Sequence, residues 1–274
     1  PLPDPHPRAA AELIDLLLGG PHFVANASLA PWVGVGYWQE ANLDEAFANY
    51  LLATPGSAGG SNSTTARRRT AVVGALQRSF RTYTAERLIA GTAYGASNTS
   101  YDDLLWWALA YLRAHELCVA QPAVLRCDDA PGGGSLLQQG RLIFDFMYDH
   151  SWNEDFCDGG YCWALKAQNY KNCVTNQQGV LVAAKLARLL PAGARCDCKA
   201  GESYRAIALR TSGWLRRSPM RNASNGLYND GLRPEPNSNA TCANDHGQSP
   251  TLPFPSSHFR GFPACDSCCL AADR

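Results

Sequence analysis

The chain has 274 residues, enough for one large domain with a sizeable core. Its 24 basic and 24 acidic residues cancel, so a nucleic acid, which binds a positively charged surface, is disfavoured as a partner. No apolar run is long enough to span a bilayer, so we expect no transmembrane segment.

Helical periodicity predicts a succession of helices with almost no strand. The predicted helices cover residues 8–18, 39–53, 65–90, 102–118, 135–149, 173–190 and 201–217. Those at 102–118 and 173–190 are apolar nearly all round, which predicts burial on every side, whereas four others carry one apolar stripe. Buried and one-faced helices in alternation suggest a double-ringed helical barrel. A large irregular bundle is the alternative, which periodicity alone does not separate from the barrel.

The C-terminal segment differs from the rest in composition. Residues 243–274 are rich in Pro, Ser and Gly and show no helical period. Such a segment buries too little apolar surface to offset the entropy of ordering it. We therefore expect a helical domain over residues 1–242 and an irregular tail over 243–274.

Eleven cysteines and five Asn-x-Ser/Thr sequences indicate a secreted glycoprotein. The glycosylation acceptors are Asn26, Asn62, Asn98, Asn222 and Asn239. The odd cysteine count leaves at least one thiol unpaired within a monomer. The first residues, Pro-Leu-Pro-Asp-Pro, include neither a Met nor a signal-like apolar segment, so we expect a processed, trimmed or partial chain.

The cysteine spacing favours disulfides over zinc. Cys196-Asp197-Cys198 has no second Cys or His pair at zinc-finger spacing, and we expect no metal site and no cofactor. Cys157 and Cys162 are separated by four residues that include two glycines, which allow a tight loop. The sequence therefore predicts a Cys157–Cys162 disulfide beside Trp163.

Two adjacent acids, Asp102 and Asp103, open the most apolar of the predicted helices. Acids at a helix start are stabilised by free N–H groups and by the positive end of the dipole. Retaining glycoside hydrolysis needs two carboxyls roughly 5 Å apart, a separation that neighbouring side chains can reach. The alternative is that one acid caps the helix and the other lies on the surface. A second pair, Asp128-Asp129, precedes Ala-Pro-Gly-Gly-Gly and is interpreted as a solvated turn.

The stretch over residues 150–176 combines aromatic rings with Asn, Thr and Lys side chains at its end. Rings can cover the apolar faces of a sugar while polar groups bind its hydroxyls. Packing of the same rings on the core is an equally good interpretation of this loop.

Six motifs over roughly residues 30–235 resemble glycoside hydrolase family 76 in order and spacing. They are Trp38-Gln39, Asp102 to Ala108, the Cys-x-Gly-Gly-x-x-Trp pattern of Cys157 to Trp163, Lys171-Asn172 with Thr175-Asn176, Ala183 to Ala187, and Asn229 to Leu232. The resemblance implies an (α/α)6 barrel that is incomplete here, with about seven of twelve helices.

The same resemblance implies the site and the function. Asp102 would be the nucleophile and Asp103 the general acid/base. The substrate-binding residues would be Trp38, Gln39, Trp106, Trp152, Gly159, Gly160, Trp163, Lys171, Asn172, Thr175, Asn176 and Asp230. The implied activity is that of a retaining endo-α-1,6-mannanase acting on α-mannan or another mannose-containing cell-wall glycan. A cell-wall transglycosidase with the same carboxylates and an inactive fragment that at most binds carbohydrate are the alternatives.

Overall fold

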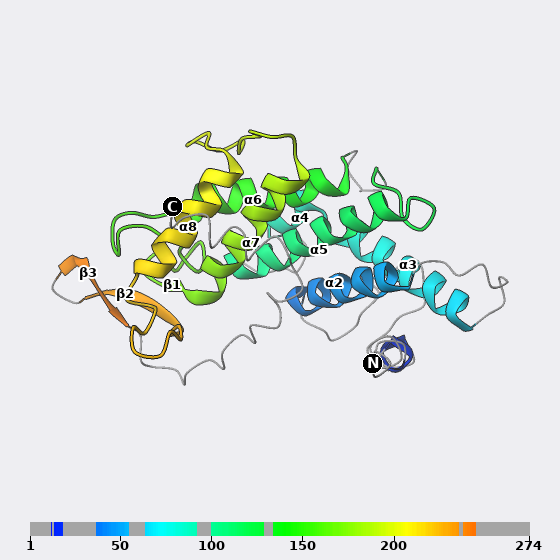
Figure 1. Ribbon diagram of the computed structural model, residues 1–274, viewed down its shortest axis with the longest axis horizontal. Helices are drawn as coiled ribbons and strands as arrows, with labels where there is room; N and C mark the ends of the chain where they lie inside the picture. The colour runs from blue at the N-terminus through cyan, green and yellow to red at the C-terminus, as the bar shows by residue number, and fades with distance from the viewer. Residues whose placement is uncertain are drawn as a thin grey trace, which may run out of the picture.

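The computed structural model describes residues 12, 14–18, 37–54, 64–91, 100–128, 134–235 and 238–244, and most of them are helical (Figure 1). The helices are α2 (Tyr37–Ala53), α3 (Thr64–Thr82), α4 (Ala85–Ile89), α5 (Tyr101–Ala120), α6 (Leu136–Ser151), α7 (Cys173–Leu189) and α8 (Tyr204–Arg217). Five predicted helices are confirmed to within three residues at each end. The helix predicted at 8–18 is helical at 12 and 14–18, and its other residues lie outside the described part.

The helix predicted at 65–90 is two helices, and the break has a local cause. Thr84 begins α4 with an extended backbone, and its side chain accepts a hydrogen bond from the Arg87 N–H. The preceding Tyr83 stacks on Trp107, with ring centroids 4.5 Å apart. A threonine able to cap a new helix and a tyrosine held by a neighbouring helix together interrupt the periodic pattern.

The helices form three antiparallel pairs, α2 with α3, α5 with α6, and α7 with α8, and α5 packs between α2 and α7. The Gln121 side chain, just after α5, donates to the Leu51 carbonyl near the end of α2 at 2.8 Å. At the other end, the Asn172 side chain before α7 donates to Asp102 in the first turn of α5. Helices α2, α5 and α7 are therefore parallel inner helices, and α3, α6 and α8 return outside them (Figure 1). This is the predicted double ring over three helix pairs.

Burial follows the predicted pattern in α5 and departs from it in α7. Twelve residues of α5 are buried, including the fully enclosed Trp107 and Tyr111, as the all-round apolar sequence predicts. In α7, Ala184 and Arg188 are exposed, so this helix presents one side to solvent. The expectation of complete burial was therefore wrong for α7.

A small antiparallel sheet, with strand order β1-β2-β3, was not predicted. Its strands are β1 (Lys171–Asn172), β2 (Gly231–Glu235) and β3 (Ser238–Asn244). Neither hairpin strand alternates polar and apolar residues, and Pro234 argues against a central strand. Pro234 is tolerated because β1 pairs only with Gly231 and Leu232, which leaves Pro234 with a partner on one side. Within the described part of residues 8–217, β1 is the only strand, as expected.

The predicted Cys157–Cys162 disulfide is wrong. Cys157 is bonded to Cys242 in β3, and Cys162 is a buried free thiol, as is Cys173. The Cys162 thiol faces the Gln168 carbonyl, with the sulfur 3.2 Å from the oxygen. Between the two predicted partners, the Gly159 carbonyl accepts a hydrogen bond from the buried Lys171 ammonium. Two further disulfides join Cys118 to Cys127 and Cys196 to Cys198.

Three other expectations concern membrane-spanning helices, the glycosylation acceptors and the C-terminal tail. No described helix combines the length and apolarity needed to cross a membrane. Asn222, one of the glycosylation acceptors, is exposed in a turn, whereas Asn26, Asn62 and Asn98 lie outside the described residues. The tail beyond Asn244 also lies outside them, so the boundary at residues 242 and 243 stays a prediction.

Candidate active site

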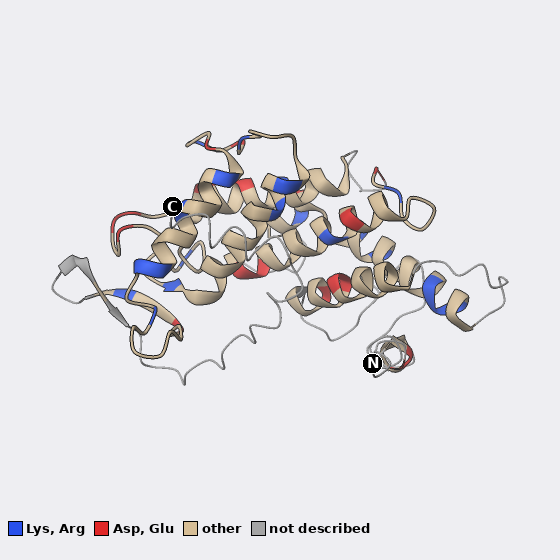
Figure 2. Cartoon of the chain, in the orientation of Figure 1, with Lys and Arg blue, Asp and Glu red and all other residues tan. Residues whose placement is uncertain are grey.

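The N-terminal ends of α2, α5 and α7 lie at one end of the helix pairs, and the predicted acid pair opens α5. Figure 2 shows acidic residues in red at the start of α5. Ser100 precedes the helix with an extended backbone, which places Asp102 and Asp103 in the first turn. Unpaired N–H groups and the helix dipole make this end favourable for negative charge.

Three N–H groups hold the carboxyl of Asp102. Its Oδ2 accepts hydrogen bonds from the indole Nε1 of Trp163 at 3.2 Å and from Nδ2 of Asn172 at 3.4 Å. Its Oδ1 accepts from the backbone N–H of Asp103 at 3.1 Å. Two residues of the predicted substrate-binding set, Trp163 and Asn172, therefore lie directly against the predicted nucleophile.

Burial and the neighbouring acid act against these donors. Burial is the largest influence and, with the charge of Asp103, raises the pKa of Asp102 to about 6, while the three hydrogen bonds lower it. A carboxyl with this pKa is mostly ionised at neutral pH and becomes protonated in mild acid. The pair thus has the electrostatic coupling that close carboxyls produce.

Asp103 has a different partner. Its Oδ2 accepts a hydrogen bond from the hydroxyl of Ser100, the residue that precedes the helix. A hydroxyl can donate to a carboxylate or accept from a carboxylic acid, so this partner suits either protonation state. Ser100 was not singled out in the sequence, although a serine three residues before an acid is a common helix-start pattern.

Asn172 joins the site to the start of α7. Its Oδ1 accepts a hydrogen bond from the Thr175 N–H at 3.2 Å, which caps the helix, while its Nδ2 faces Asp102. One turn later, Asn176 is fully buried and donates to the carbonyls of Asn172 and Tyr161. Thr175 is also fully buried. Asn172 is thus the member of this group that reaches the acid pair.

Lys171 is fully buried and holds the loop that carries Trp163. Its ammonium donates to the carbonyls of Asn153, Phe156 and Gly159, at 2.6, 2.7 and 2.5 Å. It also lies 4.0 Å from the centroid of the Phe156 ring. Burial lowers the pKa of Lys171 to about 8. All three N–H donors of the ammonium bond to carbonyls of this loop, so Lys171 holds the loop in place from the protein interior.

The two predicted glycines serve the same loop. Gly159 and Gly160 have φ angles of 120° and 94°, a region that side chains disfavour. A Cβ on Gly160 would lie 2.5 Å from the ring of Trp214, so the backbone must approach that ring closely. Trp214 in turn donates its indole N–H to the Cys157 carbonyl at 2.7 Å. Both glycines shape the loop through packing.

The remaining predicted binding residues divide between the rim and the sheet. Trp38, 41% exposed, and Gln39, also exposed, lie at the start of α2, and the half-buried Trp106 lies one turn after Asp102 on α5. Trp152 is half-buried, and the guanidinium of Arg210 stacks 4.2 Å from its ring centroid. Among the described residues, the side chains that donate hydrogen bonds to Asp102 are instead those of Trp163 and Asn172.

Asp230 connects the sheet to the aromatic side of the site. It accepts a short hydrogen bond from the hydroxyl of Tyr170, and its carbonyl accepts from the Cys173 N–H at 2.7 Å. The Tyr170 ring meets Trp163 edge-on at 6.1 Å. Asp230 is therefore one ring removed from the indole that contacts Asp102.

Another acid pair, Glu40 and Asp44 on α2, was not predicted from the sequence. Both residues are fully buried, and both accept hydrogen bonds from the Ser79 hydroxyl of α3. Burial raises the pKa of Glu40 to about 7 and, together with the charge of Glu40, raises that of Asp44 well above its ordinary value. Their spacing of four residues, on one face of a predicted helix, was the available signal.

The Asp128 side chain behaves as expected for a solvated turn. It is exposed, and its carboxylate pairs with the Arg126 guanidinium at 3.1 Å. Both side chains are largely exposed to solvent. Asp129 lies outside the described residues. Asp128 is therefore a useful reference for the acid pair of α5.

Comparison with known proteins agrees with this fold. A sequence model described as glycosyl hydrolase family 76 matches residues 32–248. No curated protein sequence matches the chain. The α-1,6-mannanase GH76A of Salegentibacter sp. HEL1_6 is similar in structure, with a TM-score of 0.58 and 16% identity over 87% of this chain and 59% of that one.

Two further solved structures are also similar. An inactive variant of the same mannanase, in complex with α-1,6-mannotriose, has a TM-score of 0.59 and 13% identity over 88% of this chain and 59% of that one. The Lin0763 protein from Listeria innocua has a TM-score of 0.54 and 17% identity over 84% and 58%. These likenesses show a shared fold, and the chain spans less than two thirds of each relative's length.

Proposed function

Because the chain belongs to glycosyl hydrolase family 76, we propose that it is a retaining glycosidase that cleaves α-1,6-mannosidic linkages of mannan by double displacement. The observation that carries this proposal is the acid pair of α5, whose two carboxyls have different kinds of partner. The related mannanase that is solved with α-1,6-mannotriose supports the choice of substrate.

The hydrogen bonds support Asp102 as the nucleophile and Asp103 as the general acid/base. Every group bonded to Asp102 is an N–H donor, and none can accept a proton, so these contacts favour the ionised form. The hydroxyl of Ser100 can serve Asp103 both with and without its proton. A residue that first donates and later accepts a proton needs such a partner.

The reaction then follows from these two states. The Asp102 carboxylate attacks the anomeric carbon while Asp103 protonates the departing glycosidic oxygen, giving a covalent glycosyl–enzyme ester. Asp103, now ionised, takes a proton from water, which attacks the anomeric carbon and releases Asp102. If a sugar hydroxyl replaces water, the same steps give transglycosylation.

For sugar binding we propose a smaller group than the sequence suggested. Trp38, Gln39 and Trp106 are exposed or half-buried near the N-terminal ends of the inner helices, and Trp163 and Asn172 adjoin Asp102. The other predicted members are proposed to support the loop and the sheet behind these five: Trp152, Gly159, Gly160, Lys171, Thr175, Asn176 and Asp230.

We further propose that the protein is a secreted glycoprotein that acts at or near a cell wall. Three disulfides fit an oxidising compartment, and Asn222 is exposed as a glycosylation acceptor must be. The proposed helical domain over 1–242 is closed by the Cys157–Cys242 bond, which ties its last residue to the loop beside the acid pair.

Product analysis on α-1,6-mannooligosaccharides that are labelled at the reducing end tests the proposal. Hydrolysis gives shorter products with retained anomeric configuration, and transglycosylation gives longer ones. Absence of any product from the unaltered chain would contradict the proposed activity.

Asp102→Asn should abolish turnover, because no ester can form. Asp103→Asn should cost most on poor leaving groups. The control Asp128→Asn should leave rates unchanged, and near-normal turnover of Asp102→Asn would overturn the assignment.

A further inference from the structure

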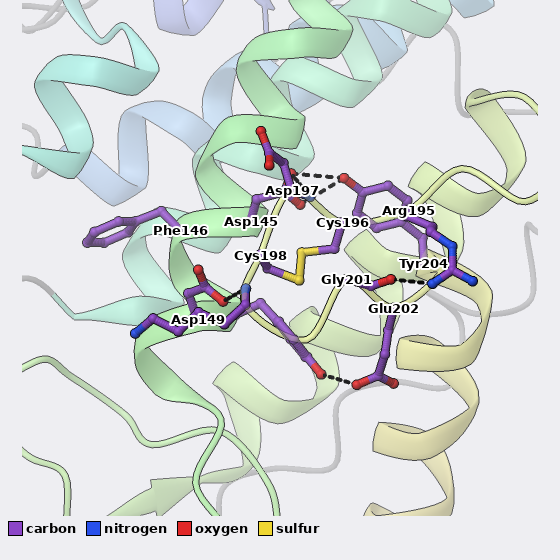
Figure 3. Close-up of a disulfide and its surroundings, with 12 residues drawn as sticks. Asp145, Phe146, Asp149, Arg195, Cys196, Asp197, Cys198, Gly201, Glu202 and Tyr204 are labelled. Atoms are coloured by element: carbon purple, nitrogen blue, oxygen red, sulfur yellow. Dashed lines mark hydrogen bonds between the residues drawn. A yellow bond between two sulfur atoms is a disulfide. The ribbon is translucent and has the colours of Figure 1, made fainter.

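The segment between α7 and α8 contains a disulfide whose two cysteines are separated by one residue. Cys196 and Cys198 are bonded, with Cα atoms 5.2 Å apart, on a loop that lies over α6 (Figure 3). Such a bridge hardly restricts the unfolded chain, because stabilisation by a cross-link grows with the length of the closed loop. By contrast, the Cys157–Cys242 bridge spans 85 positions along the chain. Stability alone therefore gives little reason for the Cys196–Cys198 bond.

Hydrogen bonds hold the loop without help from the sulfurs. The N–H groups of Asp197 and Lys199 donate to the carboxylates of Asp145 and Asp149 on α6, at 3.0 and 2.7 Å. Figure 3 shows the carboxylates of Asp145 and Asp149 beside the loop. These bonds involve backbone and carboxylate atoms only, so breaking the disulfide leaves them in place.

The ends of the loop are fixed in the same way. The N–H of Cys196 donates to the Glu202 carbonyl at 2.8 Å, and the carbonyl of Cys198 accepts from the Gly201 N–H at 2.9 Å. The Arg195 guanidinium also donates to the Gly201 carbonyl, at 2.6 Å. A reduced loop would thus keep both thiols close together, and the bridge could open and close without rearrangement of the fold.

The two cysteines differ in access. Cys196 is buried, with 4% of its surface exposed, whereas Cys198 is half-buried. A thiolate arriving from solvent therefore meets Cys198 first. Accessible disulfides in short loops belong to the labile group that takes part in exchange.

We propose that Cys196–Cys198 is a reversible dithiol–disulfide exchange site that accepts two electrons from small thiol compounds. A donor thiolate attacks Sγ of Cys198, the Cys196–Cys198 bond breaks, and Cys196 leaves as a thiolate. A second donor thiolate attacks the donor sulfur of this mixed disulfide, forming the donor disulfide and releasing Cys198. Two donor thiols are oxidised, the bridge is reduced, and the two protons end on the cysteines.

The first experiment uses the unaltered, oxidised protein. It is treated with increasing dithiothreitol or reduced glutathione, and the exposed thiols are alkylated and quantified by peptide mass spectrometry. Cys196–Cys198 should open at a concentration about tenfold lower than Cys118–Cys127, with unchanged circular dichroism, and should reclose with oxidised glutathione. Opening together with or after Cys118–Cys127, or opening with loss of helix, would overturn the proposal.

The second experiment assigns the attacked sulfur. In Cys196→Ser treated with oxidised glutathione, the Cys198 thiolate attacks the glutathione disulfide and releases one reduced glutathione; no partner cysteine resolves the mixed disulfide, so the adduct should accumulate. In Cys198→Ser the buried Cys196 should gain adduct about tenfold more slowly. Equal rates in the two variants would contradict the proposed order of attack. Both variants should keep the glycosidase rate of the parent, because neither cysteine belongs to the acid pair.

Discussion

The buried acid pair of α2 makes stability depend on pH in a direction opposite to that of most carboxylates. Glu40 is enclosed between α2 and α3, and its Oε2 has no hydrogen-bond partner among the described residues. Burial raises its pKa from 4.5 to about 7, so the native protein keeps a proton that the unfolded chain releases. Between these two pH values the native state binds more protons, and the free energy of unfolding falls as pH rises.

The size of the effect follows from the pKa. Each pKa unit corresponds to about 1.4 kcal/mol, so the rise at Glu40 represents about 3 kcal/mol of stability lost between pH 4.5 and pH values above 7. In Glu40→Gln this carboxyl cannot ionise. The variant should therefore gain about 3 kcal/mol relative to the parent on going from pH 4.5 to pH 8. In this variant Asp44 no longer has a like-charged neighbour. Its contribution to the pH dependence of stability should therefore keep the same sign and be smaller than in the parent.

Urea unfolding monitored by tryptophan fluorescence at several pH values measures this difference. Glu86→Gln, a substitution of the same type at an exposed position of α4, is the control and should follow the parent at every pH. The reasoning is refuted if the stability curves of Glu40→Gln and the parent stay parallel between pH 5 and pH 8. The double variant Glu40→Gln/Asp44→Asn should flatten the curve further.

Three other predictions concern the site and its loop. The value of kcat/KM on an α-1,6-mannooligosaccharide should fall as pH drops through about 6, because protonated Asp102 is not a nucleophile. Trp163→Phe removes a hydrogen bond that lowers this pKa and should move the acidic limb of the pH profile to higher pH. An acidic limb that stays in place would contradict the role of the indole. Lys171→Met leaves three carbonyls without their donor and should cost roughly 3 kcal/mol or more in urea unfolding, whereas a loss below 1 kcal/mol would show that water replaces the ammonium. Gly160→Ala should cost at least about 2 kcal/mol in the same assay, because its Cβ would overlap Trp214, and an unchanged midpoint would count against that contact.

The helices could be predicted because their signal is local. In α5, a run of apolar residues behind two acids specifies both the burial of the helix and its start, and the structure has both. The break at Thr84 could not be predicted from periodicity, because the apolar stripe continues across it. It depends on Tyr83 stacking on Trp107, a residue more than twenty positions later in the chain.

Contacts distant in sequence also explain two other features that were not predicted. The partner of Cys157 is set by the position of β3, and β3 is a strand because it pairs with β2, whose sequence contains Pro234. The resemblance implies Lys171 as a substrate-binding residue, which stays a prediction, but its complete burial was not predicted. Its burial depends on three carbonyls of a loop whose path no local pattern specifies.

The side chain of Asn172 performs two tasks with its two ends. Its oxygen caps the start of α7, and its nitrogen faces Asp102, so helix formation and placement of the proposed nucleophile depend on one amide. Many residues can cap a helix, among them Ser, Thr and Asp, but of the usual capping side chains only Asn also offers an N–H₂ group. Aspartate would preserve the helix while turning a second negative charge toward Asp102. The two hydrogen bonds of Asn172 thus set different requirements, and only an amide side chain meets both.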